Sequence, residues 1–223
     1  MQKRSVRIAI LVLAVLLTVT LLAVVQAGVQ TIRRLEVVEA ERDHWQRPAD
    51  VISALNLKNG SVVVDLGSGA GYFALRLSAL VGPEGKVLAV DIRKLSLLFL
   101  KIRAVLQRRN NISVIVGDLD DPHLPRDAVD SVLIANTYHE LTAPRSILRH
   151  VSNALHPGGR IVVLDRGPGP DEDPLAIAAH HHALPEAVET ELREEGFETI
   201  RTEGEFINQP GDENWWLVVA RKP

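Results

Sequence analysis

A short apolar run that passes directly into a glycine-rich turn constrains the fold of this chain most. Val62, Val63 and Val64 are β-branched residues in succession, which favour a buried strand. Asp65 and Leu66 then lead into residues 67–71, which read Gly-Ser-Gly-Ala-Gly. Glycine lets the backbone approach a ligand closely, and the free N–H groups at the start of a following helix bind polar groups. The segment therefore predicts a strand, a ligand-binding turn and a helix, as in an α/β fold.

The rest of the chain continues this alternation of strands and helices. Apolar runs such as residues 62–64 and 161–164 have no polar face, as expected for a parallel sheet covered by helices on both sides. Near the end, a helix over residues 186–195 precedes two strands, residues 199–207 and 215–220, that predict an antiparallel hairpin. We expect a doubly wound α/β sheet whose other strands are Ser61–Asp65, Lys86–Asp91, Ile112–Gly117, Val129–Ala135 and Arg160–Asp165, and whose other helices are Tyr72–Val81, Lys94–Arg109 and Ala143–Leu155.

The N-terminal segment is long and apolar enough to cross a membrane. Residues 8–25 carry no charge, and a helix over residues 8–28 would be about 31 Å long, close to the bilayer core of about 30 Å. A signal peptide cleaved after Ala27, with a basic stretch before the apolar run, is one alternative, and a buried core helix is another. We expect residues 1–34 to form a transmembrane anchor or signal-like segment, and residues 35–223 to form one domain.

Composition narrows the classes of function. The formal net charge is -3, but residues 1–34 hold five basic and no acidic residues, and the remainder holds 20 basic against 28 acidic residues. An acidic body disfavours nucleic-acid binding, because counterion release requires a cationic face. The absence of cysteine excludes disulfides, thiolate nucleophiles and Cys-ligated zinc.

The positive-inside rule does not decide which way the N-terminal segment would cross the membrane, because basic residues flank its apolar run on both sides. They are Lys3, Arg4 and Arg7 before the run, and Arg33, Arg34 and Arg42 after it.

Two acidic residues near the glycine turn indicate the kind of ligand. Asp65 would repel a pyrophosphate but attract a cationic amino-acid group. Tyr72 stands where a dinucleotide-binding turn requires Gly or Ala. Asp91 ends the second strand 20 residues after Gly71 and can accept hydrogen bonds from both hydroxyls of a ribose. An NAD(P)-dependent oxidoreductase stays an alternative, but these residues disfavour it.

At these positions the sequence resembles the class I S-adenosylmethionine-dependent methyltransferases, and the small-molecule members most closely. The resemblance extends over residues 45–221 through Gly117-Asp118, the Ala-Asn-Thr-Tyr-His-Glu-Leu run of residues 135–141, and residues 155–160 before the fifth strand. It implies a seven-stranded Rossmann-like sheet with a reversed last strand, and S-adenosyl-L-methionine as cofactor. The cofactor-binding residues that it implies are Asp65, Gly67, Ser68, Gly69, Gly71, Asp91, Asp118, Leu119 and Asn136.

The resemblance also assigns roles within this set. In that family the glycine loop lies against the methionine portion, the acid matching Asp91 binds the ribose, and the acid matching Asp118 meets the adenine amino group. Asp120 and Asp121 follow closely, so either stays an alternative to Asp118. DNA amino-methyltransferases carry Asn/Asp-Pro-Pro-aromatic after the fourth strand, whereas Asn136 is followed by Thr137. Nucleic acid is therefore not an expected substrate.

Methyl transfer from a sulfonium is an in-line displacement, so the protein chiefly aligns the acceptor with the methyl group. A protonated acceptor such as a phenol, alcohol or ammonium also needs a base. His139 is the candidate, with Tyr138 or Glu140 as its orienting group. The alternative is that His139 and Tyr138 only wall the cofactor pocket.

The expected function is that of a membrane-tethered methyltransferase acting on a small, lipophilic acceptor, with a non-catalytic cofactor-binding scaffold as the alternative. The domain is expected to be cytoplasmic because the cofactor is made there, and an exported domain stays open. The sequence specifies neither the acceptor atom nor the oligomeric state.

No metal is expected. Residues 180–182 are histidines near Asp171 and Asp173, but consecutive residues of a helix point about 100° apart, so the three histidines cannot converge on one ion. Trp215 and Trp216 alternate across a strand, which predicts one in the core and one exposed or at an interface.

Overall fold

The protein consists of two compact units, residues 1–44 and 45–223, in a computed structural model that describes residues 2–167, 184–207 and 214–223. The first unit lies within the helix α1 (Gln2–Trp45), which continues without a break through the polar stretch after Gly28. In the described part of the chain, α1 is the one helix long and apolar enough to cross a membrane. A signal sequence near the N-terminus meets the same test, so both interpretations of this segment stand.

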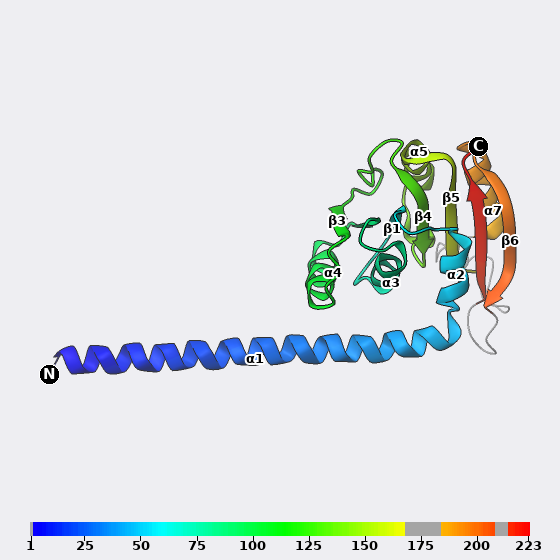
Figure 1. The fold of residues 1–223 in the computed structure, drawn as a ribbon. Helices are drawn as coiled ribbons and strands as arrows, with labels where there is room; N and C mark the ends of the chain where they lie inside the picture. Colours follow the sequence, from blue (N-terminus) through cyan, green and yellow to red (C-terminus); the bar gives the residue numbers. More distant parts are fainter. Residues whose placement is uncertain (1, 168–183, 208–213) are drawn as a thin grey trace. The chain divides into compact units, whose positions relative to one another are not determined.

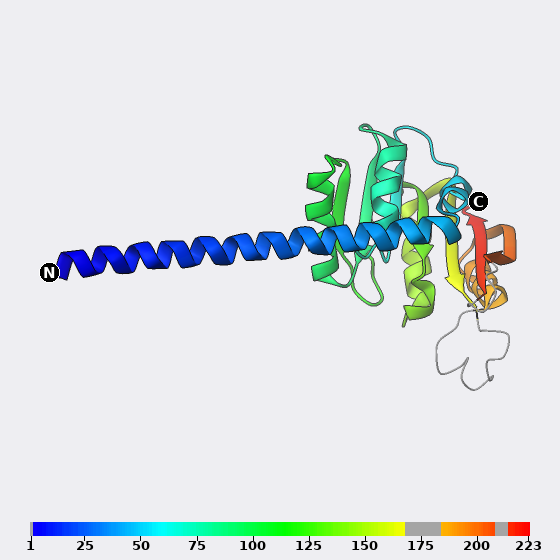
Figure 2. The ribbon, with the colours of Figure 1, turned by 90° about the horizontal axis from the view of Figure 1, so that it is seen from below.

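The second unit is built on a seven-stranded sheet with the order β3-β2-β1-β4-β5-β7-β6 (Figure 1). Strands β1 to β5 pair in parallel, and β7 pairs antiparallel with both β5 and β6. The expected doubly wound sheet with a reversed C-terminal hairpin is confirmed. The edge strands β3 and β6 lie at opposite ends of this unit (Figure 2). The strands are β1 (Val62–Leu66), β2 (Lys86–Asp91), β3 (Ile112–Val116), β4 (Val129–Ala135), β5 (Leu155–Arg166), β6 (Glu198–Ile207) and β7 (Trp215–Arg221).

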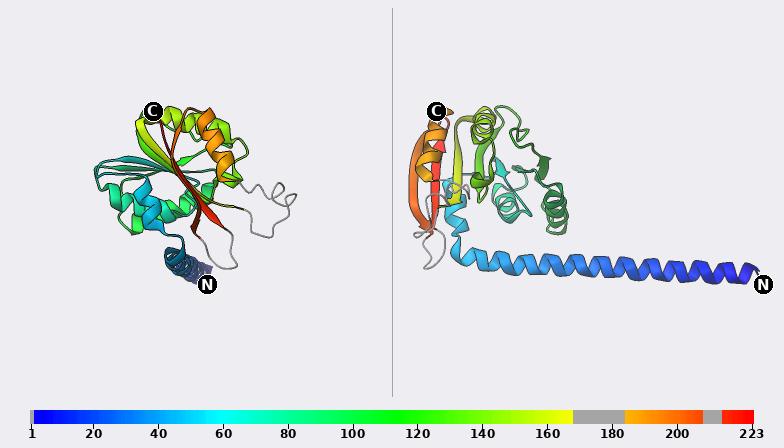
Figure 3. Two further views of the ribbon diagram at one scale, coloured as in Figure 1. Left: turned by 90° about the vertical axis from the view of Figure 1, so that its right-hand side faces the viewer. Right: turned by 180° about the vertical axis from the view of Figure 1, so that it is seen from behind.

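Helices cover both faces of the sheet, which explains why its strands are apolar throughout. One face packs against α2, α3 and α4, and the other against α5 and α7 (Figure 3). Successive strand residues alternate between the two cores, so that Val63 belongs to one and Val64 to the other. The helices are α2 (Pro48–Ala54), α3 (Tyr72–Val81), α4 (Lys94–Leu106), α5 (Pro144–Ala154) and α7 (Pro185–Glu194), and a 3-10 turn, η1 (Tyr138–Glu140), follows β4.

Several details of the second unit differ from the sequence predictions, among them the start of β5, which lies at Leu155 rather than at Arg160. Trp215 and Trp216 point to opposite faces, as predicted, but both are buried, so the exposure expected for one of them is wrong. Trp215 packs against Trp45 with ring centres 5.5 Å apart. The helix α2 was not expected: Pro48 stands in its first turn, where proline's fixed φ favours a helix start.

Candidate cofactor and active site

A cleft opens at the edge of the sheet where the parallel strands end. It is lined by segments that follow four strands in turn: Gly67 after β1, Arg93 after β2, residues 117–119 after β3, and Thr137 after β4. The strand order reverses between β1 and β4. In open α/β sheets, ligands bind outside the carboxyl ends of the strands at such a reversal. The cleft therefore lies where the fold most favours a ligand.

Two glycines of the turn are required by both space and backbone conformation. Gly67 has φ +78°, and a Cβ on it would lie 2.1 Å from Oγ1 of Thr137. Gly71 has φ +95°, and a Cβ on it would lie 2.2 Å from Cδ1 of Leu100 on α4. Any larger residue would clash and adopt a strained φ. The turn is thus held between the segment after β4 and the helix α4.

Two buried carboxylates stand at this edge. Asp65 is buried within β1, just before the glycine turn. Asp91 is buried at the end of β2, where its Oδ2 accepts the Gly69 N–H at 2.8 Å and its Oδ1 accepts the Arg93 N–H at 2.8 Å. A carboxylate oxygen has more than one acceptor site, so Asp91 can hold the turn and still accept hydrogen bonds from ligand hydroxyls.

Buried polar atoms near the turn include the Ser68 hydroxyl and the Asn136 side-chain oxygen. Neither has a hydrogen-bond partner among the described residues. Asn136 also has φ +52°, a conformation that Asn adopts more readily than most residues, and its N–H donates to the Leu164 carbonyl at 2.7 Å. Because a buried polar atom without a partner costs about 1–3 kcal/mol, these atoms point to a polar ligand.

Of the three acids that follow β3, Asp118 lines the cleft, together with Leu119. The Asp118 side chain is exposed, and its Oδ2 lies 3.0 Å from Nε2 of His123. Asp121 accepts the His123 backbone N–H at 2.7 Å, and this hydrogen bond lowers the pKa of Asp121 below its usual value. The arrangement favours Asp118 over Asp121 for contact with a ligand in the cleft.

The His139 ring turns toward the end of β5. Its Nδ1 lies 2.8 Å from Oδ1 of Asp165, and its backbone N–H donates to Oδ2 of Asp165 at 3.1 Å. The Asp165 side chain is 0% exposed and that of His139 is 9% exposed. A carboxylate only accepts, and the Arg166 guanidinium, 3.5 Å from Nε2, only donates. We therefore assign the proton of a neutral imidazole to Nδ1, which leaves a lone pair on Nε2.

Comparison with known proteins identifies the family. Residues 57–215 match a family model described as a methyltransferase domain. The chain belongs to this methyltransferase family. A solved S-adenosylmethionine-dependent methyltransferase from Aquifex aeolicus is similar with a TM-score of 0.66 and 26% identity, over 78% of this chain and 88% of that one. The chain is thus an S-adenosylmethionine-dependent methyltransferase, and the oxidoreductase alternative is set aside.

Other relatives of the methyltransferase differ more in length or sequence. The ubiquinone/menaquinone biosynthesis C-methyltransferase UbiE of Pseudomonas entomophila is 32% identical over 123 residues, which are 54% of this chain and 47% of that protein. The chain spans about half the length of the curated relatives it matches. A phosphoethanolamine N-methyltransferase 2 of Haemonchus contortus in complex with S-adenosyl-L-methionine shares the fold, with a TM-score of 0.67 and 16% identity over 80% of this chain and 53% of that one.

The residues at the cleft and next to it in the chain fit this cofactor: Asp91 lines the cleft, whereas Ser68 and Asn136 are chain neighbours of its lining residues Gly67 and Thr137. S-Adenosylmethionine carries a ribose, an adenine amino group and an amino acid, so it offers both donors and acceptors of hydrogen bonds. Asp91 retains acceptor capacity, and the buried oxygens of Ser68 and Asn136 lack partners among the described residues. The individual contacts predicted from the sequence remain predictions, but the donor and acceptor chemistry of the cleft matches the ligand.

Of the two predicted orienting groups, Tyr138 is directed away from His139 and Glu140 lies near its other ring nitrogen. The Tyr138 hydroxyl donates to Oε2 of Glu191 on α7. Burial, followed by this hydrogen bond, raises the pKa of Tyr138 well above its ordinary value. Glu140 is exposed at the cleft, with Oε1 3.9 Å from Nε2 of His139. This geometry favours Asp165 as the group that orients His139. Asp165 was missed as a partner, although its place at the end of β5 put it at the ligand-binding edge.

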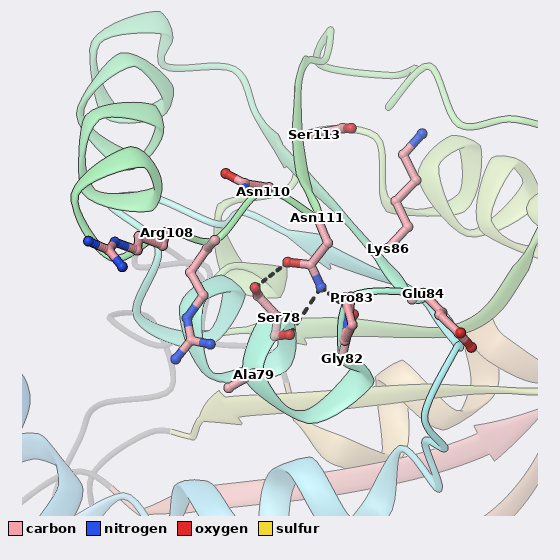
Figure 4. Close-up of a pocket in the computed structure, with 12 residues that line it drawn as sticks. Ser78, Ala79, Gly82, Pro83, Glu84, Lys86, Arg108, Asn110, Asn111 and Ser113 are labelled. Atoms are coloured by element: carbon pink, nitrogen blue, oxygen red, sulfur yellow. Dashed lines mark hydrogen bonds between the residues drawn. The ribbon is translucent and has the colours of Figure 1, made fainter.

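A second hollow lies at the opposite edge of the sheet, at the amino ends of β2 and β3 (Figure 4). Asn111 donates to the carbonyls of Ser78 at 3.0 Å and Gly82 at 2.7 Å and accepts from the Ser78 hydroxyl, which closes the turn after α3. Lys86 and Arg108 stand on opposite sides of the hollow and do not converge (Figure 4). These polar groups explain a structural turn and do not form a reactive site.

The histidines of residues 180–182, with Asp171 and Asp173, lie outside the described residues. Within residues 2–167, 184–207 and 214–223, no group of three or more His, Asp or Glu side chains is arranged to hold a metal ion.

Proposed function

We propose that this methyltransferase is tethered to a membrane through residues 8–28 and methylates a small, lipophilic acceptor with an ionisable group, such as a phenol or hydroquinone. In this proposal residues 1–34 form the anchor, and residues 35–223 form the catalytic domain on the cytoplasmic side, where the cofactor is made. The observation that carries the acceptor class is the His139–Asp165 pair: an imidazole whose Nδ1 is held by a buried carboxylate can take up a proton on Nε2.

Two further observations support a lipophilic acceptor. The exposed apolar side chains of α1 between residues 10 and 25 match a bilayer. The curated relatives, which are similar over about half their length, are C-methyltransferases of ubiquinone and menaquinone biosynthesis by name, and such quinones are lipid-soluble. Ring carbons of a hydroquinone become nucleophilic when a neighbouring hydroxyl loses its proton, so the same base serves transfer to oxygen or to carbon. After transfer to carbon, the ring C–H bond breaks, its proton leaves to solvent and the ring becomes aromatic again.

In the proposed mechanism, one set of residues holds the cofactor and His139 deprotonates the acceptor. S-Adenosylmethionine, when bound, supplies a methyl carbon activated by its sulfonium. His139 takes the proton of the acceptor hydroxyl on Nε2 and becomes an imidazolium, which the Asp165 carboxylate stabilises. A base placed in this way contributes about 10²–10⁴-fold to the rate. The residues that we propose to hold the cofactor are Asp65, Gly67, Ser68, Gly69, Gly71, Asp91, Asp118, Leu119 and Asn136.

The test uses the full chain in lipid vesicles with methyl-labelled S-adenosylmethionine and two acceptors, a prenylated hydroquinone and a water-soluble amine. Label should enter the hydroquinone, and an Asp91→Asn variant should lose this transfer. Asp127→Asn is the matched control, because Asp127 is an exposed acid paired with Lys222 at 3.5 Å. Transfer to the amine alone would refute the acceptor class. Cofactor binding without transfer to any acceptor, including extracted membrane lipid, would indicate the non-catalytic scaffold.

A further inference from the structure

The outward face of α4 is apolar. Four of its residues, spaced three or four apart, lie on one side of the helix. Their relative exposures are 82% for Leu95, 55% for Leu98, 45% for Ile102 and 69% for Val105. Ile92, just before the helix, is also exposed. We refer to these five residues as the outer stripe. The opposite side of α4 is apolar as well, because Leu97, Leu100 and Ala104 are buried against the sheet.

A surface helix ordinarily places polar residues opposite its buried face. The outer stripe breaks this rule on a helix that stands beside the edge strand β3, at one end of the second unit (Figure 1). Contiguous exposed apolar surface of this kind marks a site of interaction with another protein or with a membrane. Among the described residues of the second unit, none covers the stripe, so we look for its partner outside this unit.

Charge identifies that partner. Residues 92–109 contain six basic residues and no acidic residue, although the chain after residue 34 has an acidic excess. Lys94 and Lys101 are exposed and lie seven residues apart on α4, so they follow one flank of the outer stripe. An apolar face bordered by lysine and arginine is the pattern of a helix that lies in the interface of an anionic bilayer. A second copy of α4 would offer no acidic residue to pair with this flank.

We propose that the outer stripe of α4 inserts into the headgroup region of an anionic bilayer, with Lys94 and Lys101 against the lipid phosphates. The proposal rests on the proposed function, because the tether and the lipophilic acceptor bring the domain to a membrane. It goes further in assigning the face that contacts the lipid. Binding through such a face depends on the apolar area buried and on the anionic lipid content.

The inner side of α4 connects this surface to the cofactor site. Nη1 of Arg103 donates to the Ala70 carbonyl in the glycine turn at 2.7 Å, and Leu100 packs where Gly71 leaves room. Ile92 and Leu119, both exposed, line the cleft. A bilayer in contact with the outer stripe would therefore border the mouth of the cleft. A lipophilic acceptor would then enter from the membrane without crossing water.

The experiment exploits the absence of cysteine. Full-length chains carrying one substitution, Leu98→Cys or Ile102→Cys, are labelled with a nitroxide and reconstituted into phosphatidylcholine vesicles with or without phosphatidylglycerol. Ile200→Cys is the matched control: Ile200 is 46% exposed on β6, the edge strand at the other end of the sheet. Power saturation compares access of the label to oxygen, which partitions into bilayers, and to a water-soluble nickel chelate.

We expect labels at positions 98 and 102 to favour oxygen over nickel in vesicles with phosphatidylglycerol, and the label at position 200 to remain aqueous. Equal accessibility at all three positions would overturn the proposal. Labels at 98 and 102 that lose access to both relaxants as protein concentration rises would indicate a second copy and would also overturn it. Calorimetric titration with S-adenosylmethionine shows that each variant is folded. The two proposals fail separately: loss of lipid contact appears in the accessibility of the nitroxide, whereas failure of the proposed function appears as absent methyl transfer.

Charge reversal tests the basic flank. Lys94→Glu and Lys101→Glu, introduced beside the nitroxide at 102, should each weaken lipid contact more than about fivefold. Loss of one basic charge near an anionic surface corresponds to about a fivefold change in occupancy, and each substitution also adds an acidic charge. Lys58→Glu, on an exposed lysine before β1, makes the same change of charge as a control. High salt should act in the same direction as the two α4 substitutions. An oxygen preference unchanged by both would overturn the role of the basic flank.

Discussion

Replacement of Asp165 by Asn keeps the shape of the side chain but exchanges one acceptor oxygen for an NH₂ donor. In the native protein, Oδ1 accepts from Nδ1 of His139 and from the Arg166 N–H, both at 2.8 Å, and Oδ2 accepts from the His139 N–H at 3.1 Å. The one amide oxygen of an Asn can take the place of Oδ1, where it accepts from two donors, or the place of Oδ2, where it accepts from one. The first orientation loses fewer hydrogen bonds, so the His139 ring should keep its place but lose the charge of its partner.

The size of the effect follows from that lost charge. A hydrogen bond to a charged group contributes about 1.5–3 kcal/mol, and each 1.36 kcal/mol changes a rate tenfold. If the imidazolium forms in the transition state, kcat should fall about 10- to 100-fold. The KM for S-adenosylmethionine should not change, because Asp91 and the glycine turn lie on β2 and after β1 and are untouched.

The assay measures initial rates of labelled methyl transfer to the prenylated hydroquinone across neutral pH, with Asp127→Asn as the matched control. The Asp165→Asn variant should lose or displace the acidic limb of the pH–rate profile, and His139→Ala should remove it. An unchanged kcat and pH profile would refute the assignment of Asp165 as the positioning residue. A loss confined to the KM for S-adenosylmethionine would show that Asp165 only shapes the fold.

Three other substitutions test the site and its supports. Gly71→Ala should lower the free energy of unfolding by about 2–4 kcal/mol in urea titrations, because a Cβ would meet Leu100 and φ is positive. Ser68→Ala should weaken S-adenosylmethionine binding in calorimetry by about 5-fold or more without loss of stability, because its hydroxyl is buried without a partner among the described residues. Because the pKa of Tyr138 is raised in the folded state, its stabilising contribution is complete below pH of about 10 and is lost as pH rises further. In a Tyr72→Phe background, phenolate absorbance should therefore appear only on alkaline unfolding, and Tyr138→Phe should flatten the alkaline loss of stability.

Local patterns were sufficient for most elements of the sheet. The bounds of β2 and β4 agree with the predicted ranges, residues 86–91 and 129–135, because each holds a run of four apolar residues next to turn residues. Local pattern also sufficed for the glycine turn, whose two crowded glycines have positive φ. The start of β5 at Leu155 was missed, since a helix was predicted up to that residue. The helix α4 ends at Leu106, three residues before the predicted end, since helix termini depend on capping that an apolar pattern does not show.

The partner of His139 could not be found from chain neighbours. The sequence suggested Tyr138 and Glu140 because they are adjacent, but successive residues of a tight turn point in different directions. The carboxylate that meets the ring comes from Asp165, 26 residues away, because β4 pairs in parallel with β5 and both end at one edge. Tyr138 reaches Glu191, 53 residues away, for a similar reason. Such contacts depend on register between strands and on helix packing, which no local pattern contains.

Exposure is the property that the sequence predicts least well, and α4 and β7 show why. Both are apolar on two sides, yet both tryptophans of β7 are buried because that strand lies between two layers. The helix α4 belongs to an outer layer and has the sheet on one side only. A sequence that is apolar on both sides is therefore buried on both sides in β7, but is exposed on one side in α4. Burial within the described fold accounts for Leu97 and Leu100 but not for Leu98 and Ile102, and this exposed apolarity beside lysines is why we propose an anionic bilayer as their partner.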